Sequence, residues 1–249
     1  MRKSLIVFDL EATCWAKEDP LWERQLEDSE TIELGAVFLQ AGPEGFRISG
    51  EFDGVVRPTR NPILTQYCLE LTHITQEMVD SAPTFPEVWG RFLGWASSLG
   101  EEVRFASWGG ADPLWIARDC ESLGLENPWD STYTHVNLKE VFVRQMARLG
   151  TTYKKVGLQK ALARAGLEFI GTPHRGIDDA RMTALLGAWL YDPLSFTPAL
   201  RSLYQEHLAL GRALSREEAL KTLRGREDLL LSAEEEAHDL GAEFLMHRV

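Results

Sequence analysis

The chain opens with a dense run of aliphatic residues and continues through two further segments with the pattern of strands. Residues 4–10 form the first run, and residues 31–40 and 46–56 are rich in apolar and β-branched side chains on either side of turn-forming residues at 42–45. Such runs, bounded by glycine and proline, predict three strands. The short connection between the second and third predicts an antiparallel hairpin beside the first.

Strand and helix patterns alternate further along the chain. Thr84 and Glu87 have the spacing of a capping box that opens a helix, and Asp112 before Pro113 is typical of a helix start. The other expected elements are strands at 102–108 and 134–138, turns at 57–75, and helices at 138–149, 158–165 and 177–190. Strands followed by alternating strands and helices predict an α/β fold, a mixed sheet flanked by helices.

The character of the sequence changes after Asp192 and Pro193. Several helix-start signals follow one another, without any group of residues that suggests chemistry. We therefore expect a first domain at 1–192 and a helical C-terminal appendage at 193–249. The appendage is a candidate surface for a protein partner or for self-association.

Composition is that of an ordinary globular protein, with 249 residues of which 44% are hydrophobic. The chain has no run approaching the roughly 18 apolar residues of a membrane span, and its first apolar run is too short for a signal peptide. We expect a soluble, cytoplasmic protein that does not bind membranes. Cys14, Cys68 and Cys120 lie far apart without a CxxC spacing, which predicts reduced thiols.

Net charge argues mildly against a general nucleic-acid binder, because it is −12 and such binders depend on lysine and arginine facing phosphates. The charge is uneven, however. Residues 139–181 carry nine lysines and arginines against four acids. A local basic surface is therefore expected in spite of the acidic whole.

Two acids interrupt the first aliphatic run, in the segment SLIVFDLEATCW. Asp9 and Glu11 are two positions apart, so in a strand they project from the same face, about 6–7 Å from each other along it. A buried carboxylate needs a partner charge or a metal ion. The pair is either half of a site for a hard cation or a pair of solvated acids where the strand leaves the core.

Three further residues have the chemistry to complete such a site. In TPHRGIDDARMTALL, His174 lies in a loop five residues before Asp179, which is at a predicted helix start, and Asp112 is at another helix start. Each has a purely structural alternative: a surface histidine, an acid that favours the helix macrodipole, and an N-cap. Together with Asp9 and Glu11 they make four carboxylates and one imidazole.

From about residue 3 to residue 190 the chain resembles the DEDDh 3'-5' exonucleases, in the branch that includes histone-mRNA and small-RNA-trimming enzymes and bacterial KapD-like proteins. The resemblance rests on FDLEATCW, IELGAV, RPTRNPILTQYCLELTHITQEMVDSAPTF, WGGADP, THVNLKEVF and HRGIDDA, in the family's order and spacing. It implies a ribonuclease H-like fold and hydrolysis of single-stranded RNA or DNA from a free 3' end to nucleoside 5'-monophosphates. By resemblance Asp9, Glu11, Asp112 and Asp179 match the metal-binding acids, and His174 matches the general base.

The resemblance also suggests where the substrate is held. The backbone at Ala12 and Thr13 would face the 3'-terminal nucleotide. The segment LTHIT, especially His73, Ile74 and Thr75, would lie by its base or sugar, with core packing as the alternative for Ile74. The chain departs from many relatives at Gly110-Ala111, where a bulkier or polar residue is common. This departure bears on how the substrate strand is held.

The residue types fit phosphodiester hydrolysis on their own account. Two divalent ions about 3.5–4 Å apart stabilise the attacking and leaving oxygens, and carboxylate ligands favour Mg²⁺ or Mn²⁺. Our hypothesis is that Asp9 bridges two such ions, Glu11 and Asp179 complete the first, and Asp112 holds the second. A histidine, with its ordinary pKa near 6.5, can take the proton of water at neutral pH.

Two other classes of protein remain open at this stage. VFDLEAT is similar to the VFDLDGT opening of haloacid dehalogenase phosphatases, but Glu11 and Ala12 stand where those enzymes need Asp and Gly. A ribonuclease H-like module that binds nucleic acid without cutting it is the second alternative. Release of mononucleotides, of inorganic phosphate or of nothing would distinguish the three.

Overall fold

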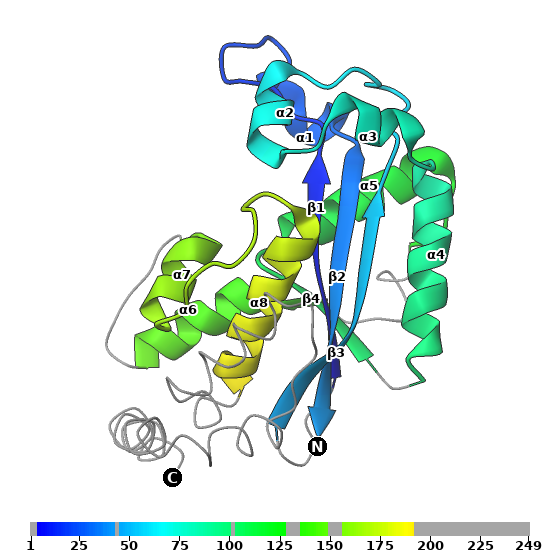
Figure 1. The fold of residues 1–249 in the computed structure, drawn as a ribbon. Helices are drawn as coiled ribbons and strands as arrows, with labels where there is room; N and C mark the ends of the chain where they lie inside the picture. The colour runs from blue at the N-terminus through cyan, green and yellow to red at the C-terminus, as the bar shows by residue number, and fades with distance from the viewer. Residues whose placement is uncertain (1–3, 43–44, 101–102, 128–134, 149–155, 192–249) are drawn as a thin grey trace.

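Five strands form one mixed sheet in the order β3-β2-β1-β4-β5 (Figure 1). This is a computed structural model, and it describes residues 4–42, 45–100, 103–127, 135–148 and 156–191. The strands are β1 (Ser4–Ala12), β2 (Thr31–Gly42), β3 (Gly45–Val55), β4 (Val103–Ser107) and β5 (His135–Asn137). β2 pairs antiparallel with β1 and β3, whereas β4 and β5 run parallel to β1. The predicted mixed sheet and its hairpin are confirmed.

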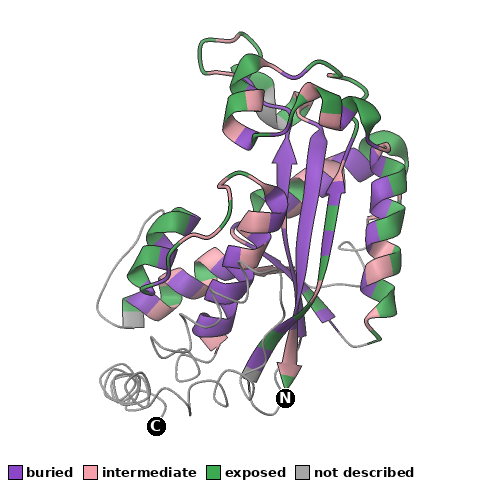
Figure 2. Cartoon of the chain, viewed as in Figure 1, coloured by how far each residue is buried: buried purple, intermediate pink, exposed green. Residues whose placement is uncertain are grey.

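Helices cover both faces of the sheet (Figures 1 and 2). On one face lie α6 (Leu138–Arg148), α7 (Leu158–Arg164) and α8 (Gly176–Tyr191), and on the other lie α4 (Phe85–Ser98) and α5 (Ala111–Leu123). Leu5 and Val7 of β1 belong to the core under α8, while Ile6 and Phe8 belong to the core under α4 and α5. Side chains alternate along a strand, so the next odd-numbered positions, 9 and 11, project on the side of α8.

The stretch at 57–75, expected to be turns, contains a helix that sequence reasoning missed. α2 (Gln66–Thr72) begins at the N-cap Thr65, whose Oγ1 accepts a hydrogen bond from the backbone N of Cys68 at 3.0 Å. The next helix, α3 (Gln76–Ser81), begins in the same way at Thr75. Two more short elements, η1 (Trp22–Arg24) and α1 (Gln25–Asp28), were not predicted either.

Two predicted helix starts had different outcomes. The capping box of α4 is present, with both reciprocal bonds between Thr84 and Glu87. The helix start at Asp112 was wrong by one residue and in its cap, because α5 begins at Ala111 with Gly110 as its N-cap. Asp112 lies inside the first turn, so its carboxylate is not used as the cap.

Other expectations concern the ends of the chain and its thiols. The three cysteines are free, as predicted, and all three are buried. Among the described residues, none of the helices is both long and apolar enough to cross a membrane. The predicted appendage at 193–249 and its boundary at residue 192 lie outside the described residues.

Candidate active site

Asp9 and Glu11 lie at the C-terminal end of β1, opposite Gly35 and Glu33 of β2. The register of the pairing shifts between Glu11 and Ala12, an irregularity of the kind that re-aims side chains next to active sites. The side chain of Glu11 is almost fully buried, and Asp9 is partly buried. Two acids in the interior of a strand therefore face the side of the sheet that α8 covers.

The first turn of α8 reaches these acids because two glycines let the backbones approach closely. A side chain at Gly35 would collide with the backbone of Gly176 and Ile177, and a Cβ on Gly176 would lie 3.1 Å from the carbonyl oxygen of Asp9. The helix consequently begins directly against β1 and β2. Asp179, in its first turn, is brought to the strand acids.

Carboxylates from three elements converge at this point. Asp9, Glu11 and Asp179 each offer an oxygen, and these oxygens all lie within 4.8 Å of one another. Asp112 comes from the first turn of α5, where its Oδ1 accepts a hydrogen bond from the backbone N of Leu10 at 3.4 Å. All four acids line one cavity of about 310 Å³, as does His174. The structure thus brings together the five residues that the sequence singled out for chemistry.

Burial and mutual repulsion make this cluster costly to ionise. Burial, followed by the charges of Asp112 and Asp179, raises the pKa of Asp9 well above its ordinary value. Burial and the neighbouring Asp179 raise the pKa of Glu11 to about 9, and burial raises the pKa of Asp179 to about 7. Closely spaced carboxylates of this kind need positive charge to be ionised together at neutral pH. Their oxygens are the donors that Mg²⁺ and Mn²⁺ take, so the residues fit a divalent metal site.

His174 stands at the edge of the cluster in a left-handed backbone conformation, with φ 62°. Its backbone N donates to Oδ2 of Asp179 at 2.7 Å, which ties the loop to the first turn of α8. Burial, and then the charge of His73, lowers the pKa of the His174 imidazole. The ring is therefore neutral, and able to accept a proton, at neutral pH.

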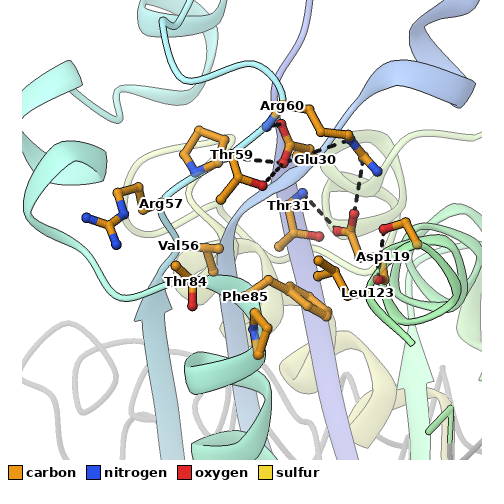
Figure 3. A pocket seen from close by; sticks show the side chains of 13 residues that line it. Glu30, Thr31, Val56, Arg57, Thr59, Arg60, Thr84, Phe85, Asp119 and Leu123 are labelled. Carbon is orange, nitrogen blue, oxygen red and sulfur yellow. Dashed lines mark hydrogen bonds and ion pairs between the residues drawn. The ribbon is translucent and has the colours of Figure 1, made fainter. Parts of the chain in front are cut away.

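Two of the predicted substrate contacts, Ala12 and Thr13, line the same cavity. Thr13 is fixed by Glu30: its backbone N donates to the Glu30 carbonyl oxygen, and its Oγ1 accepts from the Glu30 backbone N, both at 2.9 Å. The Glu30 carboxylate in turn accepts hydrogen bonds from the backbone N atoms of Thr59 and Arg60, which are drawn in Figure 3, and from that of Asn61. The wall of the site at Thr13 is thereby anchored to the loop that follows β3.

The other predicted substrate contacts lie differently. Ile74 has no exposed surface and packs in a core with Cys14, Ile32 and Cys68, so its side chain offers no surface to a substrate. Thr75 uses its hydroxyl to cap α3. Neither these two residues nor His73 is among the residues that line the cavity, although His73 is close enough to His174 to affect its pKa. A role for the three in substrate binding stays a prediction.

Several residues that shape the site were not named from the sequence. Trp108 and Trp115 line the cavity, and Glu33 anchors α8 from beneath it. Leu71 also lines the cavity and belongs to the LTHIT segment that was expected beside the substrate. Glu33 carried the same signal as Asp9, an acid within an otherwise apolar strand. The tryptophans carried none, because eight are spread along the chain and nothing in the sequence sets these two apart.

Comparison with known proteins defines the class to which this protein belongs. A family model described as "Exonuclease" (RNase_T) matches residues 6–186, so the chain belongs to this exonuclease family. The solved structure described as the nuclease domain of 3'hExo, a DEDDh family member, bound to rAMP is 26% identical, with a TM-score of 0.67. The match covers 76% of this chain and 92% of that one. The expected ribonuclease H-like fold is confirmed, and the phosphatase alternative is excluded.

Curated relatives are similar over the same region. ERI1 exoribonuclease 2 of Danio rerio is 33% identical in an alignment of 201 positions that covers 73% of this chain and 34% of that protein. The 3'-5' exonuclease Snipper of Drosophila melanogaster is 30% identical, and the match covers 71% of this chain and 65% of the length of Snipper. The chain thus spans about a third of the length of the first of these relatives.

Proposed function

We propose that this protein is a metal-dependent 3'-5' exonuclease that hydrolyses single-stranded nucleic acid to nucleoside 5'-monophosphates. The observation that carries the proposal is the convergence of Asp9, Glu11 and Asp179, with oxygens within 4.8 Å, in a cavity that Asp112 and His174 also line. A module that only binds nucleic acid has no need of four acids in one cavity. Such a cluster would repel a phosphodiester unless cations were bound.

The acids would hold two divalent cations, Mg²⁺ or Mn²⁺. Asp9 is central and would contact both ions, Glu11 and Asp179 would complete the first, and Asp112 would hold the second. Bound ions of this kind lower the pKa of water and stabilise charge on the attacking and leaving oxygens. The raised pKa values of Asp9, Glu11 and Asp179 support this assignment, because a cation is what makes joint ionisation favourable.

His174 would act as the general base. A base must be neutral before it accepts a proton, and burial lowers the pKa of this imidazole, which keeps it neutral at pH 7. The bond from its backbone N to Asp179 fixes the loop relative to the acids. The ring can therefore take the proton of the attacking water beside the cluster.

The size of the cavity favours a terminal nucleotide as the group that is bound. About 310 Å³ is at the lower end of ligand pockets, and one wall is the anchored backbone at Ala12 and Thr13. The relatives named above are described as 3'-5' exonucleases or exoribonucleases, and one related structure contains rAMP. These descriptions support a free 3' end as the substrate of this chain.

A matched panel of oligonucleotides tests the proposal. Single-stranded RNA and DNA of the same sequence, labelled at the 5' end, are incubated with the protein and Mg²⁺, and the products are separated by size and by chromatography. We expect stepwise shortening and nucleoside 5'-monophosphates, with no product in excess EDTA. Release of inorganic phosphate alone, or binding of both strands without cleavage, would refute the proposal.

A further inference from the structure

A second cavity, of about 470 Å³, lies beside the candidate active site. It is lined by Gly109, Gly110, Asn137, Lys139, Glu140, Val143 and Arg144. These residues end or follow β4 and β5, which run parallel to β1, so the cavity lies at the edge of the sheet where β1 ends in Asp9 and Glu11. Trp108, Ala111 and Asp112, on either side of the two glycines, line the first cavity. The segment at 108–112 is therefore a wall shared by both.

The two glycines present bare backbone to this second cavity. Gly109 has a φ of 132°, which residues with a side chain rarely adopt. The backbone conformation therefore explains why glycine occupies position 109. Gly110 is different: its φ is −119°, and a Cβ there would meet nothing closer than the Asn137 side chain at 3.9 Å. Glycine is among the residues favoured at an N-cap, which is the place of Gly110 in α5, and without a side chain it leaves the backbone open on the side of the cavity.

The charges around the cavity favour an anion. Lys139 and Arg144 both line it, and among the described residues neither forms an ion pair. One acid, Glu140, lines it as well, where its Oε1 accepts a hydrogen bond from Nδ2 of Asn137 at 3.4 Å. Two unpaired cations against one acid leave a net positive charge in a protein whose total charge is −12. Two of the nine cations of residues 139–181 thus line one cavity on α6.

We propose that this second cavity binds the phosphodiester backbone of the nucleotides that precede the one being cleaved, with Lys139 and Arg144 facing phosphates and Gly110 leaving room for the strand. The inference rests on the proposed exonuclease function and extends it: the acids hold the 3'-terminal nucleotide, and α6 holds the strand behind it. Phosphate contacts position a strand without reading its sequence. Occupation of this cavity therefore makes the enzyme prefer long strands over minimal substrates, whatever their sequence.

The test compares a strand that reaches the second cavity with a substrate that cannot. The long substrate is a 12-nucleotide single strand, and the minimal one is the p-nitrophenyl ester of thymidine 5'-monophosphate, which carries a single nucleotide. The variants are Lys139→Gln and Arg144→Gln. The control is Arg91→Gln, an exposed arginine on α4, which covers the opposite face of the sheet (Figure 1).

We expect each of the two variants to lower kcat/KM on the 12-nucleotide strand about 5- to 20-fold at low salt and to leave hydrolysis of the ester unchanged. For single strands the logarithm of affinity changes with the logarithm of salt concentration by about 0.7 for each phosphate neutralised. The salt dependence of kcat/KM should therefore become shallower by about 0.7 for each charge removed. Glu140→Gln should act in the opposite direction and raise kcat/KM on the strand, because it removes the acid from the cavity.

Three results would overturn the inference while the proposed function stands. The first is a kcat/KM of the Lys139 and Arg144 variants on the strand within twofold of the parent value. The second is an equal loss of kcat/KM in Arg91→Gln, and the third is an equal loss of kcat/KM on the ester. A parent protein that hydrolyses neither the ester nor the strand with Mg²⁺ present would instead refute the proposed function itself, and this inference with it.

Discussion

The guanidinium of Arg175 binds the carboxylate of Glu33, which has no exposed side-chain surface, at 2.6 Å from Nη2 to Oε1 and 3.0 Å from Nε to the same oxygen. The backbone N of Gly176 also donates to this carboxylate, at 2.6 Å. The ion pair joins β2 to the residue just before α8, four residues ahead of Asp179. It therefore sets the position of one member of the acidic cluster from beneath.

Arg175→Ala should destabilise the protein and impair the site together. The change leaves Glu33 buried without its cation, and breaking a buried pair in this way costs about 3–5 kcal/mol. Denaturant unfolding at pH 7 should show a loss of this size. Arg24→Ala is the control, because the Arg24–Glu27 pair is exposed on both sides and such pairs contribute about 0–1 kcal/mol. Equal losses in the two variants would contradict the anchoring role of Arg175.

Asp9→Asn should abolish hydrolysis while the fold persists. Asparagine keeps the volume of the side chain and removes the charge that would contact both cations. Charge stabilisation by bound metal contributes several kcal/mol, so a loss of about 10³-fold or more is expected. Single-turnover assays with saturating Mg²⁺ measure it, and circular dichroism checks the fold. Rates within tenfold of the parent would rule out the two-metal assignment.

His174→Ala should lower the rate by about 10²- to 10⁴-fold with strand binding retained, as expected for loss of a positioned general base. The pKa of this imidazole is lowered by burial and by His73. In the parent, the rate should therefore fall only when the pH drops below the ordinary range of histidine, where the ring becomes protonated. A pH–rate profile of both proteins tests this expectation. If the variant has the same pH–rate profile as the parent, His174 is a surface residue and not the general base.

The stabilising effect of Mg²⁺ on the folded protein should depend on pH. The pKa of Asp179 is raised from 3.8 to about 7 and that of Glu11 from 4.5 to about 9, so without metal the folded state holds protons that the unfolded state has lost. Stability of the metal-free protein should then fall as the pH rises from about 4 towards 9. Mg²⁺ should restore it, and more strongly at pH 8 than at pH 5. Thermal melts with Mg²⁺ or EDTA at several pH values measure both effects, and a Mg²⁺ effect that is independent of pH would contradict them.

The sequence predicted the sheet well because its strands carry strong local signals. Apolar runs and the turn at 42–45 located β1, β2 and β3, and the spacing of Thr84 and Glu87 located the start of α4. Signals failed where a helix is short. α2 and α3 are 7 and 6 residues long, within a stretch rich in proline and threonine, and only their N-cap threonines marked them.

The two strand acids of the candidate site could be predicted because they lie in an apolar environment, which is also why their ionisation costs free energy. Asp9 and Glu11 interrupt an apolar strand, and such an interruption is visible in one dimension. Gly35 and the Glu33–Arg175 pair were not predicted, because the reason for each lies in a contact with a segment about 140 residues away. The cavity on α6 likewise depends on how β4 and β5 end side by side, which no local pattern records.

The direction of attack is the last expectation, and it separates an exonuclease from an endonuclease with the same metal chemistry. The cavity that holds the acids is walled by Thr13 and Leu71, from two segments that the Thr65 hydroxyl links by donating to the Cys14 carbonyl oxygen at 2.7 Å. If this wall encloses the 3'-terminal nucleotide, as proposed, a strand that continued past that nucleotide would collide with it. A 5'-labelled linear strand should therefore shorten stepwise, and a 3'-phosphate should slow or block it. Closed circular single strands of the same sequence should resist. Cleavage of circles at a rate comparable with that of linear strands would overturn the exonuclease assignment and leave the metal site of Asp9, Glu11, Asp112 and Asp179 in place.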